Sequence, residues 1–127
     1  MTPQTLRLLP TVLAVCRLPV TAPLPEWASA SPFCSITRTP EELSVVCTQA
    51  DVPRSVRHEP DWRCLQVQGP LPFSLIGVLA DLSATLARAS IPIFVLSTFD
   101  TDYLLVKQET LPQTLAALRQ EGHHILE

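Results

Sequence analysis

The second half of the chain has the clearest pattern of apolar and polar positions. Residues 62–69 alternate apolar and polar side chains before a glycine, which predicts a strand. Residues 91–98 are almost continuously apolar, as expected of a strand covered by helices. Between them, residues 70–90 begin with prolines that are compatible with a helix start. A helix is predicted there because apolar side chains recur at spacings of three and four, at Phe73, Ile76, Leu79, Leu82 and Leu86.

The following segments complete a known order of elements. Residues 102–109 form a short apolar run that is close enough to residues 91–98 to pair with them as a hairpin. Residues 111–122 repeat leucines at helical spacing and stop at Gly122, which predicts a second helix, and residues 123–127 predict a last strand. Strand, helix, strand, strand, helix, strand (βαββαβ) is the order of α+β ferredoxin-like folds, in which both helices lie on one face of a four-stranded antiparallel sheet.

The first half of the chain echoes the second. Residues 33–53 and residues 93–112 both read as a strand, a turn with threonine and acidic residues, a second strand and a proline-containing exit. Residues 6–19 would supply the opening strand of the first copy, and the proline-rich connection after them only a short helix. A repeat of this kind predicts two modules of one fold in tandem. We expect an irregular first module at residues 1–60 and a regular second module at residues 61–127.

Composition and charge narrow the possible partners. The chain is 46% hydrophobic and 17% charged with a net charge of -3, so it can bury a core. Its basic residues are scattered, which argues against a nucleic-acid or anionic-membrane partner, and no apolar stretch approaches the ~20 residues of a membrane span. The stretch "LLPTVLAVC" is similar to a short secretory signal, but Pro10 and Arg17 interrupt it. We therefore expect a soluble, cytoplasmic protein.

Cysteines and histidines give no motif for a metal or a cofactor, and we expect neither. The four cysteines match neither a redox pair nor the ligand pairs of zinc sites: Cys16, Cys34, Cys47 and Cys64. Each lies in an apolar neighbourhood, so we predict free, buried thiols, with a disulfide framework as the alternative. His123 and His124 are adjacent on a predicted strand and should point to opposite faces, which excludes a simple bidentate metal site.

Two stretches resemble a known family. "SITRTPEELSVVC" (residues 35–47) and "STFDTDYLLV" (residues 97–106), together with residues 69–96 and the closing "GHHI", resemble small bacterial proteins made of two ACT modules, the aspartate-kinase-like ACT group. Amino-acid sensors of the CASTOR type are similar over the same segments. The resemblance implies ferredoxin-like modules that pair edge to edge and bind an amino acid at the interface between modules.

The candidate ligand-binding residues fall at three places. Gly69 and Phe73 flank the junction between a strand and a helix start, where backbone N–H groups could approach a carboxylate. The resemblance implies that the next turn faces the ligand groove, so one of its acids could hold an ammonium group. The residues of this turn are Ser97, Thr98, Phe99, Asp100, Thr101 and Asp102. Thr37 and Glu42 belong to the corresponding turn of the first module.

Each candidate has a purely structural alternative. Aspartate and threonine commonly close their own turn through hydrogen bonds to the backbone, which could be the whole role of Asp100 and its neighbours. In "TPEE", Thr39 could cap a turn or helix start. Gly77 would lie inside the predicted helix at a cost of ~1 kcal/mol relative to alanine, so a close packing contact or a ligand contact should compensate there.

The sequence thus favours a regulatory protein that binds an amino acid or a related small molecule and acts through the pairing of its modules. The alternative is a structural interaction module that binds no ligand and mediates homodimerisation or docking on an enzyme. Either way we expect a homodimer, because two tandem modules leave at least one sheet edge or apolar helix face unpaired, and pairing about a two-fold axis would cover it. We do not expect an enzyme, since no nucleophile lies in an activating motif and no phosphate-binding loop is present.

Overall fold

The computed structural model describes residues 2–72 and 74–127, and the chain divides into two compact units. The first is formed by residues 11–62, and the second by residues 63–127 together with the first ten residues. We call them the 11–62 unit and the 63–127 unit and describe each by itself. The boundary lies close to the expected one at residue 60, but the first ten residues belong to the second unit and not to the first.

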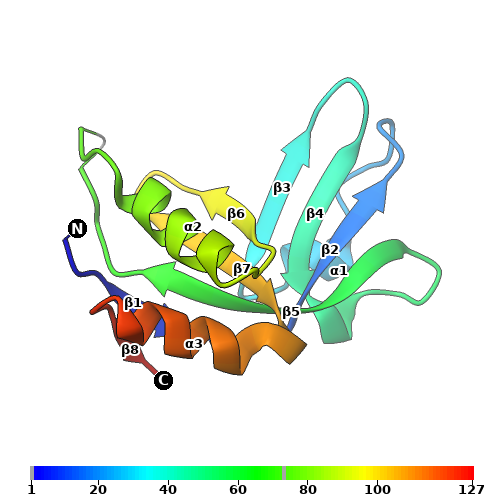
Figure 1. Cartoon of the computed structure of the whole chain (residues 1–127). Helices are drawn as coiled ribbons and strands as arrows, with labels where there is room; N and C mark the ends of the chain where they lie inside the picture. Colours follow the sequence, from blue (N-terminus) through cyan, green and yellow to red (C-terminus); the bar gives the residue numbers. More distant parts are fainter. Residues whose placement is uncertain (1, 73) are drawn as a thin grey trace. The chain divides into compact units, whose positions relative to one another are not determined.

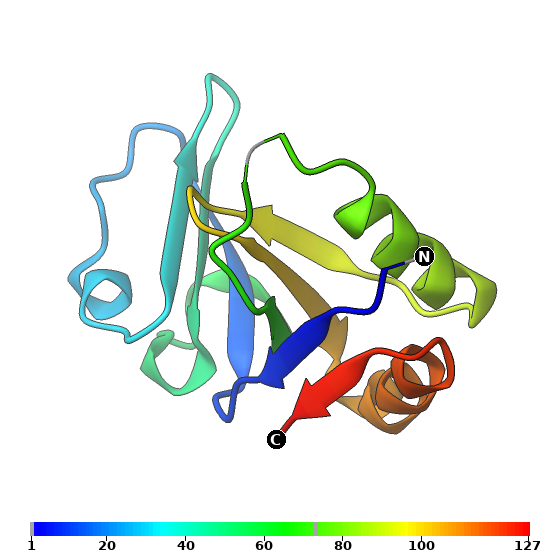
Figure 2. The same cartoon turned by 90° about the vertical axis from the view of Figure 1, so that its left-hand side faces the viewer.

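The 63–127 unit has the predicted order of strands and helices, with one additional strand. Its elements are β1 (Thr5–Leu8), the end of β5 (Arg57–Val67), α2 (Val78–Arg88), β6 (Phe94–Ser97), β7 (Asp102–Lys107), the short 3-10 helix η2 (Gln108–Thr110), α3 (Leu111–Gln120) and β8 (His124–Leu126). The strand order in its sheet is β8-β1-β5-β7-β6. Both helices contact each other and cover the same face of this sheet (Figures 1 and 2).

The prediction of a purely antiparallel four-stranded sheet is wrong for this unit. β1 lies between β5 and β8, antiparallel to β5 with Leu6 opposite Val67, and parallel to β8 with Leu6 opposite Ile125. The expected single strand over residues 6–19 is broken at Pro10, which has no N–H to donate to a ladder. The break separates β1 from the strand that follows, and β1 joins the sheet of the 63–127 unit.

Helix α2 begins later than predicted. It starts at Val78, and Gly77 before it has a φ of 89°, in the left-handed region that a right-handed helix cannot use. Ile76, which was predicted on the core face, is 93% exposed. Leu82 and Leu86 do lie in the core, so the helical pattern was correct only from Val78 onward. Phe73 lies outside the described residues.

The core of the 63–127 unit joins its helices to its sheet. It is made of leucines, isoleucines and valines from both layers, and its fully buried members are Leu6, Leu65, Val67, Leu82, Leu86, Leu104, Val106 and Leu118. Burying a side chain of this size contributes about 1.5–3 kcal/mol, so these residues dominate the stability of the unit.

The 11–62 unit is smaller and less regular, as expected. It contains β2 (Leu13–Leu18), the single-turn α1 (Glu26–Ser29), β3 (Cys34–Arg38), β4 (Leu43–Thr48), the 3-10 helix η1 (Gln49–Asp51) and the first part of β5, with antiparallel strands in the order β3-β4-β2-β5. In its β3–β4 turn, the Thr39 hydroxyl accepts the N–H groups of Glu41 and Glu42 at 3.2 Å each. The capping alternative for "TPEE" is therefore confirmed.

Cysteines and the two adjacent histidines occupy contrasting environments. Cys16, Cys47 and Cys64 are buried, as predicted, whereas Cys34 is exposed because it begins the edge strand β3. His123 is buried and His124 is exposed. Among the described residues, no group of histidine, cysteine or acidic side chains could hold a metal ion, and no helix is long and apolar enough to cross a membrane.

His123 is hydrogen-bonded, as a neutral imidazole, to the residue that precedes the first strand. The N–H of Gln4 donates to His123 Nδ1 at 3.0 Å, and the N–H of His124 donates to the Gln4 carbonyl at 2.9 Å. Only a neutral imidazole can accept at Nδ1. Burial lowers the pKa of His123 and favours this neutral form, against the opposing charges of Glu121 and Asp81.

Acidification should therefore destabilise the 63–127 unit through His123. In the unfolded chain His123 takes up a proton below about pH 6.5, whereas in the folded protein its lowered pKa keeps it neutral to a lower pH. The free energy of unfolding therefore falls as the pH decreases from about 6.5 to the pKa of the folded state. Urea unfolding at a series of pH values should show a shallower fall in His123→Gln than in the parent protein. His124→Gln, at the exposed neighbour, should keep the parent slope; an unchanged slope in His123→Gln would contradict this account.

Candidate functional site

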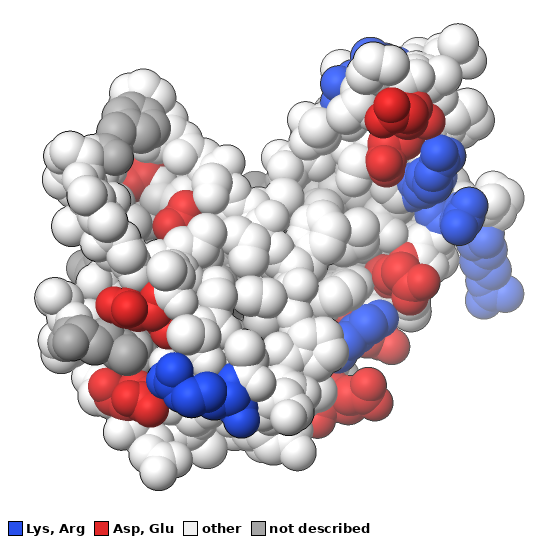
Figure 3. All heavy atoms as spheres, turned by 45° about the horizontal axis from the view of Figure 1, so that its top comes forward, with Lys and Arg blue, Asp and Glu red and all other residues white. Residues whose placement is uncertain are grey.

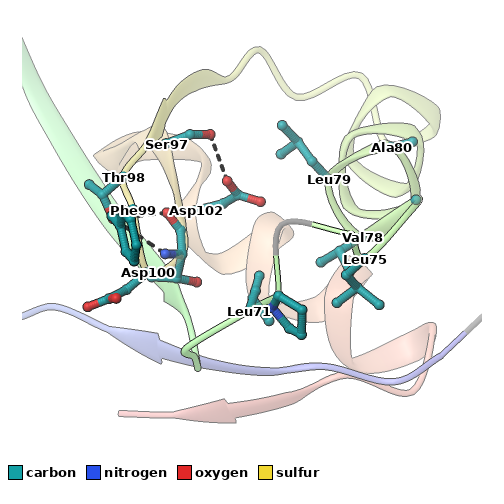
Figure 4. A pocket seen from close by; sticks show the side chains of 13 residues that line it. Leu71, Leu75, Val78, Leu79, Ala80, Ser97, Thr98, Phe99, Asp100 and Asp102 are labelled. Atoms are coloured by element: carbon teal, nitrogen blue, oxygen red, sulfur yellow. Dashed lines mark hydrogen bonds between the residues drawn. The ribbon is translucent and has the colours of Figure 1, made fainter.

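A cavity of about 290 Å³ lies in the 63–127 unit between the start of α2 and the β6–β7 turn (Figure 4). One wall comes from the segment that leads into α2 and from its first turn: Leu71, Pro72, Leu75, Gly77, Val78, Leu79 and Ala80. The opposite wall is the β6–β7 turn with the strand ends beside it: Ser97, Thr98, Phe99, Asp100, Thr101 and Asp102.

The threonines of the β6–β7 turn have structural roles. Thr98 donates its N–H to the Thr101 carbonyl at 2.8 Å, and its hydroxyl reaches the same oxygen at 3.2 Å. The Thr101 hydroxyl is buried and donates to the carbonyl of Val67, in β5, at 2.6 Å. The alternative of turn closure thus holds for the side chain of Thr98, whereas the side chain of Thr101 fixes the turn to the sheet.

Two acids of this turn differ in direction. Asp102 is half-buried at the start of β7 and points into the cavity, where the Ser97 hydroxyl donates to its Oδ1 at 2.6 Å (Figure 4). Asp100 is exposed and points away from the cavity (Figure 4). An ionised carboxylate accepts about four hydrogen bonds, so Asp102 keeps acceptor capacity for a cationic or N–H-bearing group beyond Ser97.

The wall that faces Asp102 is apolar at its side chains and offers donors at its backbone. Leu75, Val78 and Leu79 lie across the cavity from the acid (Figure 4). The first N–H groups of a helix have no partner within the helix and carry a positive partial charge, which here applies to the start of α2. No lysine or arginine is among the described lining residues. The cavity therefore combines one carboxylate, an apolar surface and the positive end of a helix.

Two glycines shape the segment that leads into α2. A Cβ at Gly69 would lie 3.0 Å from the carbonyl oxygen of Asp100 and 3.1 Å from the Cβ of Thr101, which is tighter than most Cβ contacts, so any larger residue would require the β6–β7 turn to shift. At Gly77 a Cβ would meet nothing within 4 Å. The expected packing contact at Gly77 is therefore wrong, and its left-handed φ is the reason for glycine there.

The structure brings together part of the predicted site. The whole turn from Ser97 to Asp102 lines the cavity. Gly69 does not line the cavity but lies against this turn, next to Asp100 and Thr101. Thr37 and Glu42 belong to the 11–62 unit, at the β3–β4 hairpin. Sequence reasoning missed the apolar wall because its residues were assigned to a core helix; the two prolines and Gly77 were the available signal for a loop.

Charged groups are otherwise dispersed. In the space-filling view, acidic and basic side chains are interspersed and most of the visible face is uncharged (Figure 3).

Comparison with known families identifies the class of protein. The family model described as ACT domain matches residues 57–120, and a second model, described as an N-terminal domain, matches residues 12–55. The chain belongs to the ACT domain family.

Particular relatives agree with this assignment. The chain is 36% identical over 64 residues to the human "Cytosolic arginine sensor for mTORC1 subunit 1", a match that covers 48% of this chain and 20% of that protein. The chain thus spans only a fifth of the length of that sensor. Among solved structures, protein Atu0741 from Agrobacterium tumefaciens superposes with a TM-score of 0.94 at 38% identity, covering 99% of this chain and 94% of that one.

A more distant structure shares the fold alone. The regulatory subunit of aspartate kinase from Thermus thermophilus superposes with a TM-score of 0.60 at 12% identity, covering 88% of this chain and 93% of that one. Membership of the ACT domain family and the similarity to the arginine sensor support a regulatory, amino-acid-binding role in general terms.

The buried hydroxyl of Thr101 provides a test of how the site is anchored. Thr101→Val leaves the Val67 carbonyl without its donor and should lower the free energy of unfolding by about 1–3 kcal/mol. Thr101→Ser retains the donor and should lose less than Thr101→Val. Urea unfolding of the three proteins gives the comparison; equal stability of the valine and serine variants would mean that this bond does not hold the turn.

Proposed function

We propose that this protein is a regulatory protein that binds a free amino acid or a close analogue in the cavity of its 63–127 unit. The observation that carries the proposal is the direction of Asp102, whose carboxylate points into a cavity opposite an apolar wall and the positive end of α2. These are the three kinds of partner that a zwitterion with an apolar side chain requires.

Each part of an amino acid has a matching surface. Its ammonium group would bind Asp102, which Ser97 holds in place through the 2.6 Å hydrogen bond. Its carboxylate would accept from the first N–H groups of α2, where the helix dipole favours an anion. Its side chain would pack on Leu75, Val78 and Leu79.

The size of the cavity agrees with a small ligand. Pockets for drug-sized molecules and cofactors occupy about 300–1,000 Å³, and this one, at about 290 Å³, lies at the lower limit. A nucleotide cofactor would need more room, so a single amino acid is the better fit. The proposal assigns no ligand contact to Thr37 or Glu42. Both belong to the 11–62 unit, where Thr39 closes the β3–β4 turn.

Regulation would follow from a change in pairing. We propose that the 11–62 unit is a second, less regular ACT module, and that ligand binding biases the pairing of modules or of subunits. Edge strands available for a homodimer are β3 in the 11–62 unit and β6 or β8 in the other. A cytosolic location is supported by the name of the human relative.

One observation favours the alternative, a docking module without a ligand. Ile76 is 93% exposed and Phe99 is 80% exposed, and apolar side chains of this size are common at protein interfaces. Under this alternative Asp102 would only close its turn with Ser97, and no small molecule would change the stability of the protein.

Thermal unfolding with each proteinogenic amino acid at millimolar concentration separates the two functions. A ligand at 100 times its dissociation constant stabilises by about 2.7 kcal/mol, which raises the midpoint visibly. We expect one amino acid, or a small group of similar ones, to raise the midpoint of the parent protein. We expect Asp102→Asn to lose most of that rise, because the amide cannot pair with an ammonium charge.

Asp100→Asn is the matched control, since this acid lies on the same turn but points away from the cavity. It should keep the rise. The binding proposal fails if no amino acid shifts the midpoint, or if both variants lose the shift equally. Recovery of the ligand chemically unchanged after incubation would distinguish a sensor from a catalyst.

A further inference from the structure

Three of the four thiols gather on one face of the sheet in the 11–62 unit. Cys34 in β3 lies directly opposite Cys47 in β4. On the other side of β4, Cys47 lies opposite Ala14 of β2, and Cys16 follows two residues later on the same face. Cys16 and Cys47 are fully buried, whereas Cys34 at the sheet edge is exposed.

The strand register decides how close Cys34 and Cys47 are. The turn between the strands is closed by the Thr39 N–H, which donates to the Glu42 carbonyl at 2.9 Å, so residues 39 and 42 form a hydrogen-bonded pair. Hydrogen-bonded and non-hydrogen-bonded pairs alternate along an antiparallel ladder. Counting back through the five residue pairs of β3 and β4 places Cys34 and Cys47 in a non-hydrogen-bonded pair.

The ladder between β2 and β4 gives the same answer independently. The N–H of Gln49 donates to the Val12 carbonyl at 3.0 Å, which makes the Ala14–Cys47 pair hydrogen-bonded by the same alternation. In a central strand, a residue that is hydrogen-bonded toward one neighbour faces the other neighbour in a non-hydrogen-bonded pair. Cys47 therefore faces Cys34 across β3 in the pair type with the shorter Cα separation, although its thiol is hydrogen-bonded to that of Cys16 on the other side.

This geometry selects one disulfide among the possible ones. The Cα atoms of a non-hydrogen-bonded pair are about 4.5 Å apart, within the range of about 4.4–6.8 Å that a disulfide spans. The Cα atoms of the diagonal neighbours Cys16 and Cys47 are about 7–8 Å apart by the same sheet geometry, which is beyond that range even though the two thiols are hydrogen-bonded. Cys16 and Cys34 are separated by the whole of β4, at about twice the ~4.8 Å strand spacing.

We propose that Cys34 and Cys47 form an oxidative modification site, at which a hydroperoxide converts the two thiols into a cross-strand disulfide. The sulfur of Cys34, as thiolate, attacks the peroxide oxygen, the O–O bond breaks, and Cys34 becomes a sulfenic acid with release of water. The Cys47 sulfur then attacks Cys34, and the sulfenic hydroxyl leaves as a second water. Two electrons pass from the sulfurs to one hydrogen peroxide molecule.

The environments of the thiols set the order and the pH dependence of these steps. Cys34 meets the oxidant first because it is the exposed member on the edge strand. A hydrogen bond with Cys16, together with burial, raises the pKa of Cys47, and burial raises that of Cys34. The thiolate is the reactive form, so the cross-link should form slowly at neutral pH and faster at alkaline pH.

Peptide mapping of the oxidised full chain tests the proposal. The protein is treated with a slight excess of hydrogen peroxide at neutral and mildly alkaline pH, remaining thiols are alkylated, and the chain is digested with trypsin. Cleavage at Arg7, Arg17, Arg38, Arg54, Arg63 and Arg88 places the four cysteines on four different peptides. We expect a linked pair of peptides, residues 18–38 with residues 39–54, that forms faster at the higher pH and separates on reduction.

Three variants provide the controls. Cys34→Ser, at an exposed position, should abolish the linked pair, whereas Cys16→Ala and Cys64→Ala should retain it. Cys64 is the matched isolated thiol, because burial raises its pKa to about 12 and it has no cysteine partner in the ladder of the 11–62 unit. A dominant link from Cys16 to Cys47, a link between two chains through Cys34, overoxidation of Cys34 alone, or unreacted thiols at alkaline pH would each overturn the proposal.

Discussion

The close backbone approach between the end of β5 and the β6–β7 turn is the contact on which the site depends. Leu71 donates its N–H to the Asp100 carbonyl at 2.7 Å, and the buried Thr101 hydroxyl holds the Val67 carbonyl at 2.6 Å. A side chain at Gly69 would fall between the two segments, 3.0 Å from the Asp100 oxygen. This contact holds the turn, and the half-buried Asp102 at its end points into the cavity toward α2.

The remaining features of the cavity follow from that attachment. The chain leaves the contact through two prolines and reaches α2 only after Gly77, whose left-handed φ reverses its direction. The start of α2 then faces the turn, so a helix N-terminus, which carries a positive partial charge, lies across the cavity from a carboxylate. Opposite charge preferences at the two walls give the cavity a polarity that suits a zwitterion, and the leucine and valine side chains between them suit an apolar substituent.

Local patterns in the sequence predicted those parts of the structure that local physics determines. The alternation at residues 62–69, the leucine spacing of α3 and the polar turn from Ser97 to Asp102 were all readable, because each arises from neighbours in the chain. The insertion of β1 beside β8 was not, since it depends on pairing between residues more than a hundred positions apart. Apolar residues before Val78 also recur at helical spacing, so the sequence analysis assigned the apolar wall to a helix that in fact begins only at Val78. The pairing of Cys34 with Cys47 required the strand register, which spacing alone does not provide.

The most direct test of the central claim is an NMR titration of the isotopically labelled full chain with the amino acid that gives the largest thermal shift. Amide resonances of the first turn of α2 and of residues 97–102 should move together and saturate with one dissociation constant, because both walls contact the same ligand. Resonances of the β3–β4 hairpin should follow later or not at all. Perturbations that saturate elsewhere while both walls stay unchanged would contradict the assignment of this cavity as the binding site.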